Sequence, residues 1–242
     1  MISLLSIETS TKTCSVALSI EGERVFERIR QEEASHASQL GVFVWEAVTY
    51  ARTHCKEIDA VAVSSGPGSY TGLRIGVSEA KGLCYGKGIP LIAIPTLTIL
   101  AHAVAKILLP EGAKGVNAED YPYLCPMIDA RRMEVYAALY DIHLREIRPV
   151  QAEIVEKDSY EEYLKKRSVL FCGDGSNKCR SLIQSPNAQF VDFIYPTAAA
   201  MIPLAEEAFM RKKFVDVAYF EPFYLKEFQA TVAKNKVFLE RK

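Results

Sequence analysis

The stretch SSGPGSYTGLRIG, from Ser64 to Gly76, places glycines, a proline and hydroxyl residues between an apolar run and a helical pattern. The run before it, IDAVAVSS, predicts a short strand that is buried on both faces. The residues after it predict a helix from about Thr71 to Tyr85, closed by glycines. A strand, a glycine turn and a helix in this order indicate an α/β protein.

Working outward from this stretch, the first half of the chain predicts one compact α/β lobe. Residues 2–31 predict three antiparallel strands, and the apolar spacing at 36–53 predicts an amphipathic helix. After the glycine helix come a strand at 90–94 and a helix at 96–108. The order β-β-β-α-β-α-β-α therefore fills an expected lobe of residues 1–109.

The second half repeats this order without obvious sequence identity. It begins with strands and closes with a long helix at about 197–213, after a polar, glycine-containing stretch at 110–122. We therefore expect a second α/β lobe at 122–226 and a loosely held tail at 227–242. Further helices of this lobe are expected at 159–167 and after Ser176.

Composition indicates an ordinary globular protein. The chain has 242 residues, 49% of them apolar and 24% charged, and a formal net charge of -1. It therefore has no global basic field to hold nucleic acid unaided. The short basic runs at 131–132 and 211–213 are typical of solvated surface. The segment 91–109 approaches the length of a membrane span, but Pro95 interrupts it, which favours a strand, a turn and a helix.

The cysteines and the N-terminus favour a reducing, cytoplasmic location. None of the six cysteines forms a CxxC pair, which argues against a zinc ribbon and against a disulfide scaffold. The opening MISLLSIETS lacks a basic region and reaches a glutamate at position 8, so it does not read as a signal peptide.

The glycine loop has two interpretations. A glycine turn at a helix N-terminus attracts anions through free N–H groups and the helix dipole, so a phosphate site is one alternative. The loop lacks the lysine of a P-loop, and Gly66, Gly68 and Gly72 do not have the spacing of the dinucleotide fingerprint. In the other interpretation, Gly72, Gly76 and Ala80 recur every four positions and let a neighbouring element approach closely.

The helix at 36–53 supports a packing role. Beside its core stripe it carries a second apolar row, formed by Gly41, Val44, Trp45 and Val48. Two apolar stripes indicate a second neighbour, and a tryptophan often anchors a protein interface. The alternative, that Trp45 belongs to the core, stays open.

The sequence offers few residues for catalysis or for metal binding. The four histidines form no HExxH or HxxxH motif, and no GxSxG elbow is present. If the chain were a nucleotide-dependent kinase or ATPase, Glu8, Asp129 and Asp174 would be the candidate Mg²⁺ ligands. A metallopeptidase is a further alternative, although no peptidase centre is evident.

Several motifs together resemble one known family. GPGSYTGLRIG, followed by AKGL and PLIAIPTL and preceded by LSIETST, is similar to the corresponding stretches of the TsaB (YeaZ) family. SHASQL, MIDARRMEVY, GDG and EPFYLK follow in the family's order, so the resemblance covers essentially the whole chain. The first-lobe motif is long and specific, whereas the later motifs support it through their order.

This resemblance implies an actin-like (ASKHA, ribonuclease H-like) fold with two related α/β lobes. It implies a non-catalytic subunit that supports TsaD, the enzyme that transfers a threonylcarbamoyl group to the adenosine beside the anticodon of tRNA. The ATPase TsaE would join the assembly, and tRNA would be contacted only there. No cofactor is expected on this chain alone, since ATP or threonylcarbamoyl-adenylate and the metal would sit on partner subunits.

The resemblance also points to the surface that partners use. In the family the first two helices pair with the equivalent helices of TsaD, or with themselves in a homodimer, and here they correspond to 36–53 and 71–85. On this basis Gly76→Trp is expected to abolish partner binding while leaving the monomer folded. The expected interface residues are Trp45, Val48, Gly72, Leu73, Gly76, Val77 and Ala80.

Overall fold

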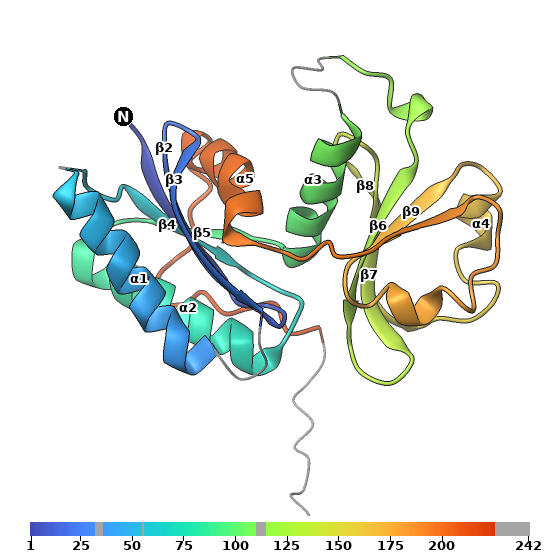
Figure 1. Ribbon diagram of the computed structural model, residues 1–242, viewed down its shortest axis with the longest axis horizontal. Helices are drawn as coiled ribbons and strands as arrows, with labels where there is room; N and C mark the ends of the chain where they lie inside the picture. The colour runs from blue at the N-terminus through green and yellow to red at the C-terminus, as the bar shows by residue number, and fades with distance from the viewer. Residues whose placement is uncertain (32–35, 55, 110–114, 226–242) are drawn as a thin grey trace, which may run out of the picture.

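The computed structural model describes residues 1–31, 36–54, 56–109 and 115–225. Two five-stranded sheets lie beside one another, and two helices stand between them (Figure 1). The tail expected at 227–242 lies outside the described residues.

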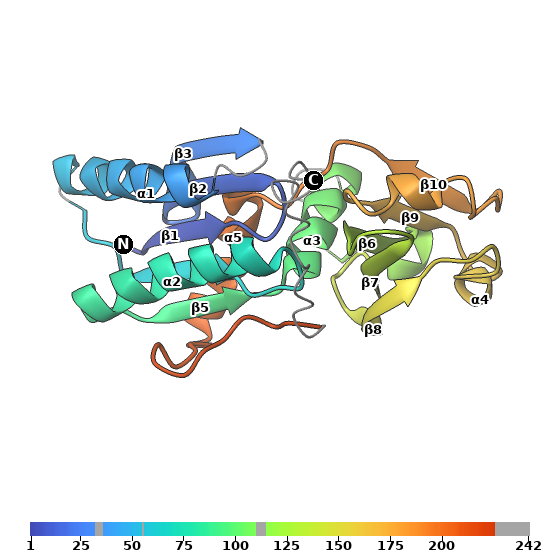
Figure 2. The same ribbon diagram turned by 90° about the horizontal axis from the view of Figure 1, so that it is seen from below.

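The first sheet has the strand order β3-β2-β1-β4-β5. β1 pairs antiparallel with β2 and parallel with β4, so the opening meander and the first crossover share one sheet. Helices α1 (His36–Thr53) and α2 (Tyr70–Lys87) cover one face of it (Figure 2). The strands are β1 (Ser3–Glu8), β2 (Thr13–Ile20), β3 (Glu23–Gln31), β4 (Ala60–Ser64) and β5 (Leu91–Ile94).

The second sheet repeats this arrangement, with the order β10-β9-β6-β7-β8. β6 pairs antiparallel with β7 and parallel with β9, as β1 does with β2 and β4. This confirms the predicted actin-like fold of two related lobes. The strands are β6 (Tyr123–Asp129), β7 (Glu134–Tyr140), β8 (Glu146–Ile154), β9 (Val169–Cys172) and β10 (Ala188–Val191), and the short helices are η1 (Ala118–Asp120), α4 (Glu161–Leu164) and η2 (Asn177–Cys179).

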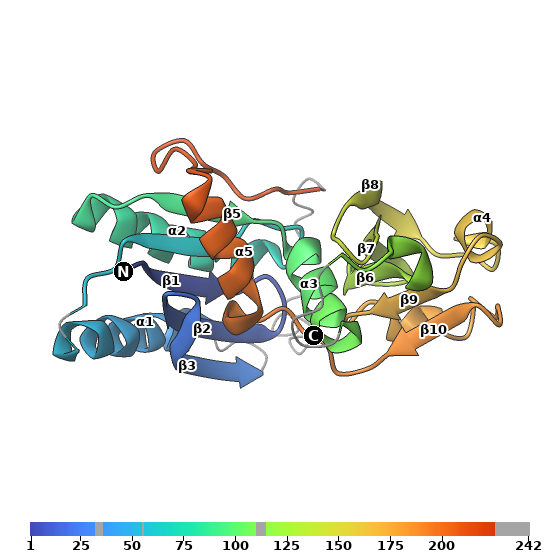
Figure 3. The same ribbon diagram turned by 90° about the horizontal axis from the view of Figure 1, so that it is seen from above.

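The last helix of each lobe packs mainly on the sheet of the other lobe (Figure 3). Helix α3 (Thr96–Leu108) follows β5, yet Leu100 and Val104 join the core formed with β6 and β9. Helix α5 (Ala198–Met210) follows β10, yet Met201 and Ala205 pack with residues of β1, β4 and β5. The exchange ties the two lobes together through apolar burial.

The lobes expected at 1–109 and 122–226 therefore each include a helix that packs mainly on the sheet of the other lobe. Helix α5 and the segment after it return to the first lobe, because their apolar residues complete the core of the first sheet. We call residues 213–225 the C-terminal strap. Val215 forms a bridge with Leu91 of β5, and the Phe223 N–H donates to the Ser65 carbonyl oxygen at 2.7 Å.

Two local expectations also change. The helix expected at 159–167 is only the four-residue α4, and the helix expected after Ser176 is the single turn η2.

The segment 91–109 is the predicted strand and helix, interrupted at Pro95. Among the described residues, no helix combines the length and the apolarity that crossing a bilayer would need.

Candidate partner-binding helices

Helix α1 has an inner face and an outer face of different character. Its inner row, formed by Leu40, Phe43, Val44, Ala47 and Ala51, is buried on the first sheet. On the outer face Trp45 is 67% exposed and Val42 is 49% exposed. Trp45 is therefore not a core residue, and Val48 is half-buried against the core. A large exposed aromatic side chain beside a second apolar residue is typical of an interface anchor.

Helix α2 has well-defined ends. Ser69 is its N-cap, and the Ser69 hydroxyl accepts a hydrogen bond from the Gly72 N–H at 3.2 Å. At the other end Gly88 adopts a φ of 66°, which favours glycine, and its N–H donates to the Cys84 carbonyl oxygen. The glycine loop is therefore the N-terminal entry of an 18-residue helix.

The small-residue stripe that the sequence singled out faces inward. Gly72, Gly76 and Ala80 are all buried within the chain, as are Leu73 and Val77. The expectation that these five residues offer a groove to another subunit does not fit the structure, because the protein's own first sheet and its adjoining turn occupy that face. Of the residues expected at the interface, Trp45 is exposed and Val48 is half-buried, and their contact with a partner stays a prediction.

The turn after β1 fills the space that the glycines leave. A Cβ atom on Gly72 would overlap the Thr9 carbonyl oxygen, and one on Gly76 would overlap the Thr9 hydroxyl. The expected outcome of Gly76→Trp is therefore wrong in one respect: so large a side chain at this position would disrupt the folded monomer itself.

The same turn also meets the entry of α2. The Ser69 N–H donates to the Ser10 carbonyl oxygen at 2.6 Å, and a Cβ atom on Gly68 would overlap that same oxygen. Backbone of the chain thus lies where a phosphate would have to approach the loop. This favours the packing interpretation of the glycine loop over the phosphate-site interpretation.

Glu8, at the end of β1, is fully buried next to this turn. Its Oε1 atom accepts a hydrogen bond from the Ser10 N–H at 2.6 Å, whereas its Oε2 atom has no hydrogen-bond partner among the described residues. Burial raises the pKa of Glu8 to about 7, and hydrogen bonds from Ser10 oppose that rise. The carboxyl group therefore supports the turn.

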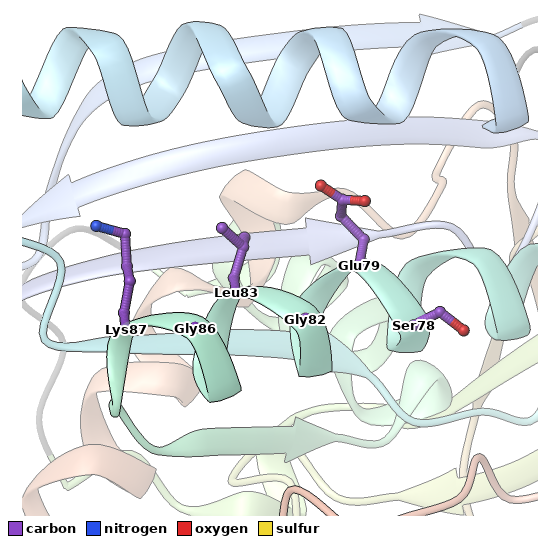
Figure 4. Close-up of a pocket in the computed structure, with 6 residues that line it drawn as sticks. All are labelled: Ser78, Glu79, Gly82, Leu83, Gly86 and Lys87. Atoms are coloured by element: carbon purple, nitrogen blue, oxygen red, sulfur yellow. The ribbon is translucent and has the colours of Figure 1, made fainter.

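The outer face of α2 carries a second small-residue stripe with the same four-residue spacing, formed by Ser78, Gly82 and Gly86. A Cβ atom on Gly82 or on Gly86 would meet nothing within 4 Å. These residues line a shallow depression of about 260 Å³, from which the Glu79 and Leu83 side chains extend toward α1 (Figure 4). The periodicity that singled out Gly72 and Gly76 could equally have pointed here, but spacing alone does not tell which face turns inward.

The candidate Mg²⁺ ligands do not assemble into one site. The Asp174 carboxylate accepts from the Asp129 N–H at 3.0 Å, and Lys178 forms an ion pair with Asp129. Within the described part of the chain, no three His, Cys, Asp or Glu side chains gather as metal ligands would, so Glu8 does not join the two aspartates.

Comparison with known proteins identifies the family. The chain is 32% identical over 231 residues to the Escherichia coli K12 protein named tRNA threonylcarbamoyladenosine biosynthesis protein TsaB, covering 92% of this chain and 94% of the relative. The chain belongs to the TsaB family. The Haemophilus influenzae TsaB protein is 28% identical over 237 residues, covering 93% of this chain and 94% of the relative.

Two further comparisons agree with membership in the TsaB family. A sequence profile described as "TsaD: tRNA N6-adenosine threonylcarbamoyltransferase" matches residues 29–234. A crystal structure from Pseudomonas aeruginosa, described as an uncharacterized protein with similarity to peptidase YEAZ, superposes with a TM-score of 0.77 at 27% identity, over 93% of this chain and 100% of that one. The TsaB family is thus related in sequence to the transferase family.

Proposed function

We propose that this TsaB-family chain is a non-catalytic subunit that binds the threonylcarbamoyltransferase TsaD through the outer faces of α1 and α2. In this role it supports transfer of a threonylcarbamoyl group to the adenosine beside the anticodon of tRNA. The observation that carries the proposal is that both helices have an unfilled outer face, with Trp45 exposed on α1 and an open depression on α2.

The chemistry of this surface suits a protein helix. The depression is shallow and is formed where glycines carry no side chain, so another helix can approach the α2 backbone closely. Trp45 and Val42 add exposed apolar area on α1, and Tyr85, 87% exposed, adds an aromatic side chain on α2. Aromatic anchors beside small residues are a common composition for a helix-packing interface.

The relationship to TsaD supports the choice of partner. The transferase profile matches most of this chain, so the two proteins share a related architecture. Two related chains that present equivalent helix pairs can associate about an approximate twofold axis. The same geometry would permit a homodimer, which competes with the heterodimer for these helices.

The remaining parts of the machinery belong to the partners in this proposal. TsaE joins the TsaD-bound chain, ATP or threonylcarbamoyl-adenylate and the metal bind to those subunits, and tRNA is contacted only in the full assembly.

Co-elution on size exclusion and a reconstituted tRNA modification assay test the proposal. Gly82→Arg adds a long charged side chain where a Cβ atom meets nothing, so the monomer stays folded while the face is blocked. We expect this variant to lose co-elution with TsaD and to reduce threonylcarbamoyladenosine formation at least about tenfold.

The matched control is Ile154→Arg, which makes a similar change at a residue 66% exposed on β8 of the other lobe. We expect this variant to behave as the wild type in both assays. Undiminished co-elution of Gly82→Arg, or transfer activity by the chain without TsaD, would refute the proposal.

A further inference from the structure

The turn formed by residues 8–10 meets α2 along one line of glycines. Gly68, Gly72 and Gly76 follow one another at intervals of four residues, and each lies against Thr9 or Ser10. Gly72 and Gly76 therefore share one face at the start of α2, Gly68 lies just before the N-cap, and no side chain of these glycines separates them from the turn.

Two hydrogen bonds join the turn to the helix at this line. The Thr9 hydroxyl donates to the Gly72 carbonyl oxygen at 2.8 Å, and the Ser10 carbonyl oxygen accepts from the Ser69 N–H at 2.6 Å. Thr9 and Ser10 are both fully buried. These two hydrogen bonds are thus shielded from water. At such a buried site, the loss of a hydrogen-bond partner costs more free energy than it does at the surface.

The contact between the turn and the glycines fixes two things: the rotation of α2 about its own axis and the position of α2 along that axis relative to the first sheet. If the helix slipped by one residue, Leu73 or Val77 would replace a glycine against Thr9, and there is no room for either side chain. Because the helix is rigid over this length, its rotation and axial position also determine where Gly82 and Gly86 lie relative to α1.

We infer that Thr9 is a positioning residue for partner binding: the turn holds α2 in the one rotation and axial position at which its outer depression, beside α1 (Figure 4), matches the partner. The inference rests on the proposed function, since it concerns the same two helices. Thr9 does not touch the partner. Thr9 instead increases the fraction of molecules in which α1 and α2 have the arrangement that binds the partner. The apparent affinity is proportional to that fraction.

Affinity for TsaD, measured by calorimetry with the full chain, tests the inference. Gly76→Ala places a methyl group against the Thr9 hydroxyl and displaces α2, so we expect the dissociation constant to rise about tenfold. Adding Thr9→Ala removes the clashing atoms and leaves a Cβ–Cβ separation of 3.3 Å. Because Thr9→Ala also removes the hydrogen bond to Gly72, we expect this double variant to bind only about twofold more tightly than Gly76→Ala alone.

A milder pair of variants keeps the test decisive if Gly76→Ala does not fold. Thr9→Val preserves shape but removes the hydrogen bond to Gly72, whereas Thr9→Ser retains the hydroxyl. We expect Thr9→Val to weaken binding about fivefold and Thr9→Ser to bind as the wild type. The control is Thr13→Val, at a buried threonine whose hydroxyl lacks a hydrogen-bond partner among the described residues, and it should leave the affinity unchanged.

Thermal unfolding separates positioning from a purely structural role. If Thr9→Val and Gly76→Ala lower the melting temperature but bind TsaD as tightly as the wild type, the inference is overturned. If the wild-type chain does not bind TsaD at all, the proposed function fails instead, and the two failures are distinguishable.

Discussion

The Thr9 hydroxyl donates a hydrogen bond to the carbonyl oxygen of Gly72, 63 positions further along the chain. A turn hydroxyl that could have satisfied its own backbone instead joins the end of β1 to the first turn of α2. This contact gives the glycine loop its role, because it requires small residues on the inner face of α2. The outer face is then free for a different set of contacts.

The two faces of α2 should respond oppositely to the same substitution. Gly72→Ala would force a methyl group onto the Thr9 carbonyl oxygen, so we expect it to lower the free energy of unfolding by about 2 kcal/mol or more. Gly82→Ala meets open space and improves helix propensity, so it should raise that free energy by about 0.5–1 kcal/mol. Urea denaturation of both variants checks this, and equal effects would contradict the assignment of the faces.

Glu8 should make the protein less stable as pH rises through the weakly acidic range. Its pKa is about 7 in the folded state, because burial disfavours the charged form, against an ordinary value of 4.5. The folded state therefore binds its proton more tightly than the unfolded state does. Between those values the free energy of unfolding falls with increasing pH, by about 3 kcal/mol in total from this group.

Glu8→Gln removes this titration while retaining an oxygen that can accept from the Ser10 N–H. We expect the variant to lose the fall in stability between pH 5 and pH 7.5, as measured by denaturation at a series of pH values. The same pH dependence in the variant and in the wild type would show that Glu8 is not its source.

His102 should have the opposite effect on the pH dependence and make the protein less stable as pH falls. Burial lowers the pKa of its imidazole, and its Nδ1 atom lies 3.1 Å from the Ala200 carbonyl oxygen of α5. The unfolded state then binds the proton more readily, so stability is lost as pH falls below the ordinary value of 6.5. In His102→Gln the denaturation midpoint should fall less between pH 7 and pH 5 than in the wild type; an unchanged profile would exclude His102 as a contributor.

The C-terminal strap should depend on Lys81. Its Nζ atom donates to the carbonyl oxygens of Ala218 and Phe220, each at 3.0 Å. Lys81→Met keeps the aliphatic stem but removes both bonds, so we expect a loss of about 1–2 kcal/mol and faster proteolysis within residues 213–225. Lys157→Met, at an exposed lysine of the other lobe, is the control. Unchanged cleavage of the strap in Lys81→Met would show that Lys81 does not hold it.

The sequence predicted the elements better than it predicted their partners. The bounds of α1 and α3 match the helices expected at 36–53 and 96–108, and β5 lies within the strand expected at 90–94, because local patterns decide such elements. The packing of α3 and α5 on the opposite sheets was not predicted, because periodicity does not encode contacts between distant segments. The inward direction of Gly72 and Gly76 was missed for the same reason, since it depends on the turn at Thr9.

The most direct test of the central claim is photocrosslinking from defined positions on the two lobes. A benzophenone amino acid is placed at position 82 on the outer face of α2 or, as the control, at position 154 on β8, and each chain is mixed with TsaD. We expect a crosslink to a helix of TsaD from position 82 and none from position 154. Capture of TsaD from position 154 alone, or from neither position under conditions where the two proteins co-elute, would contradict this expectation.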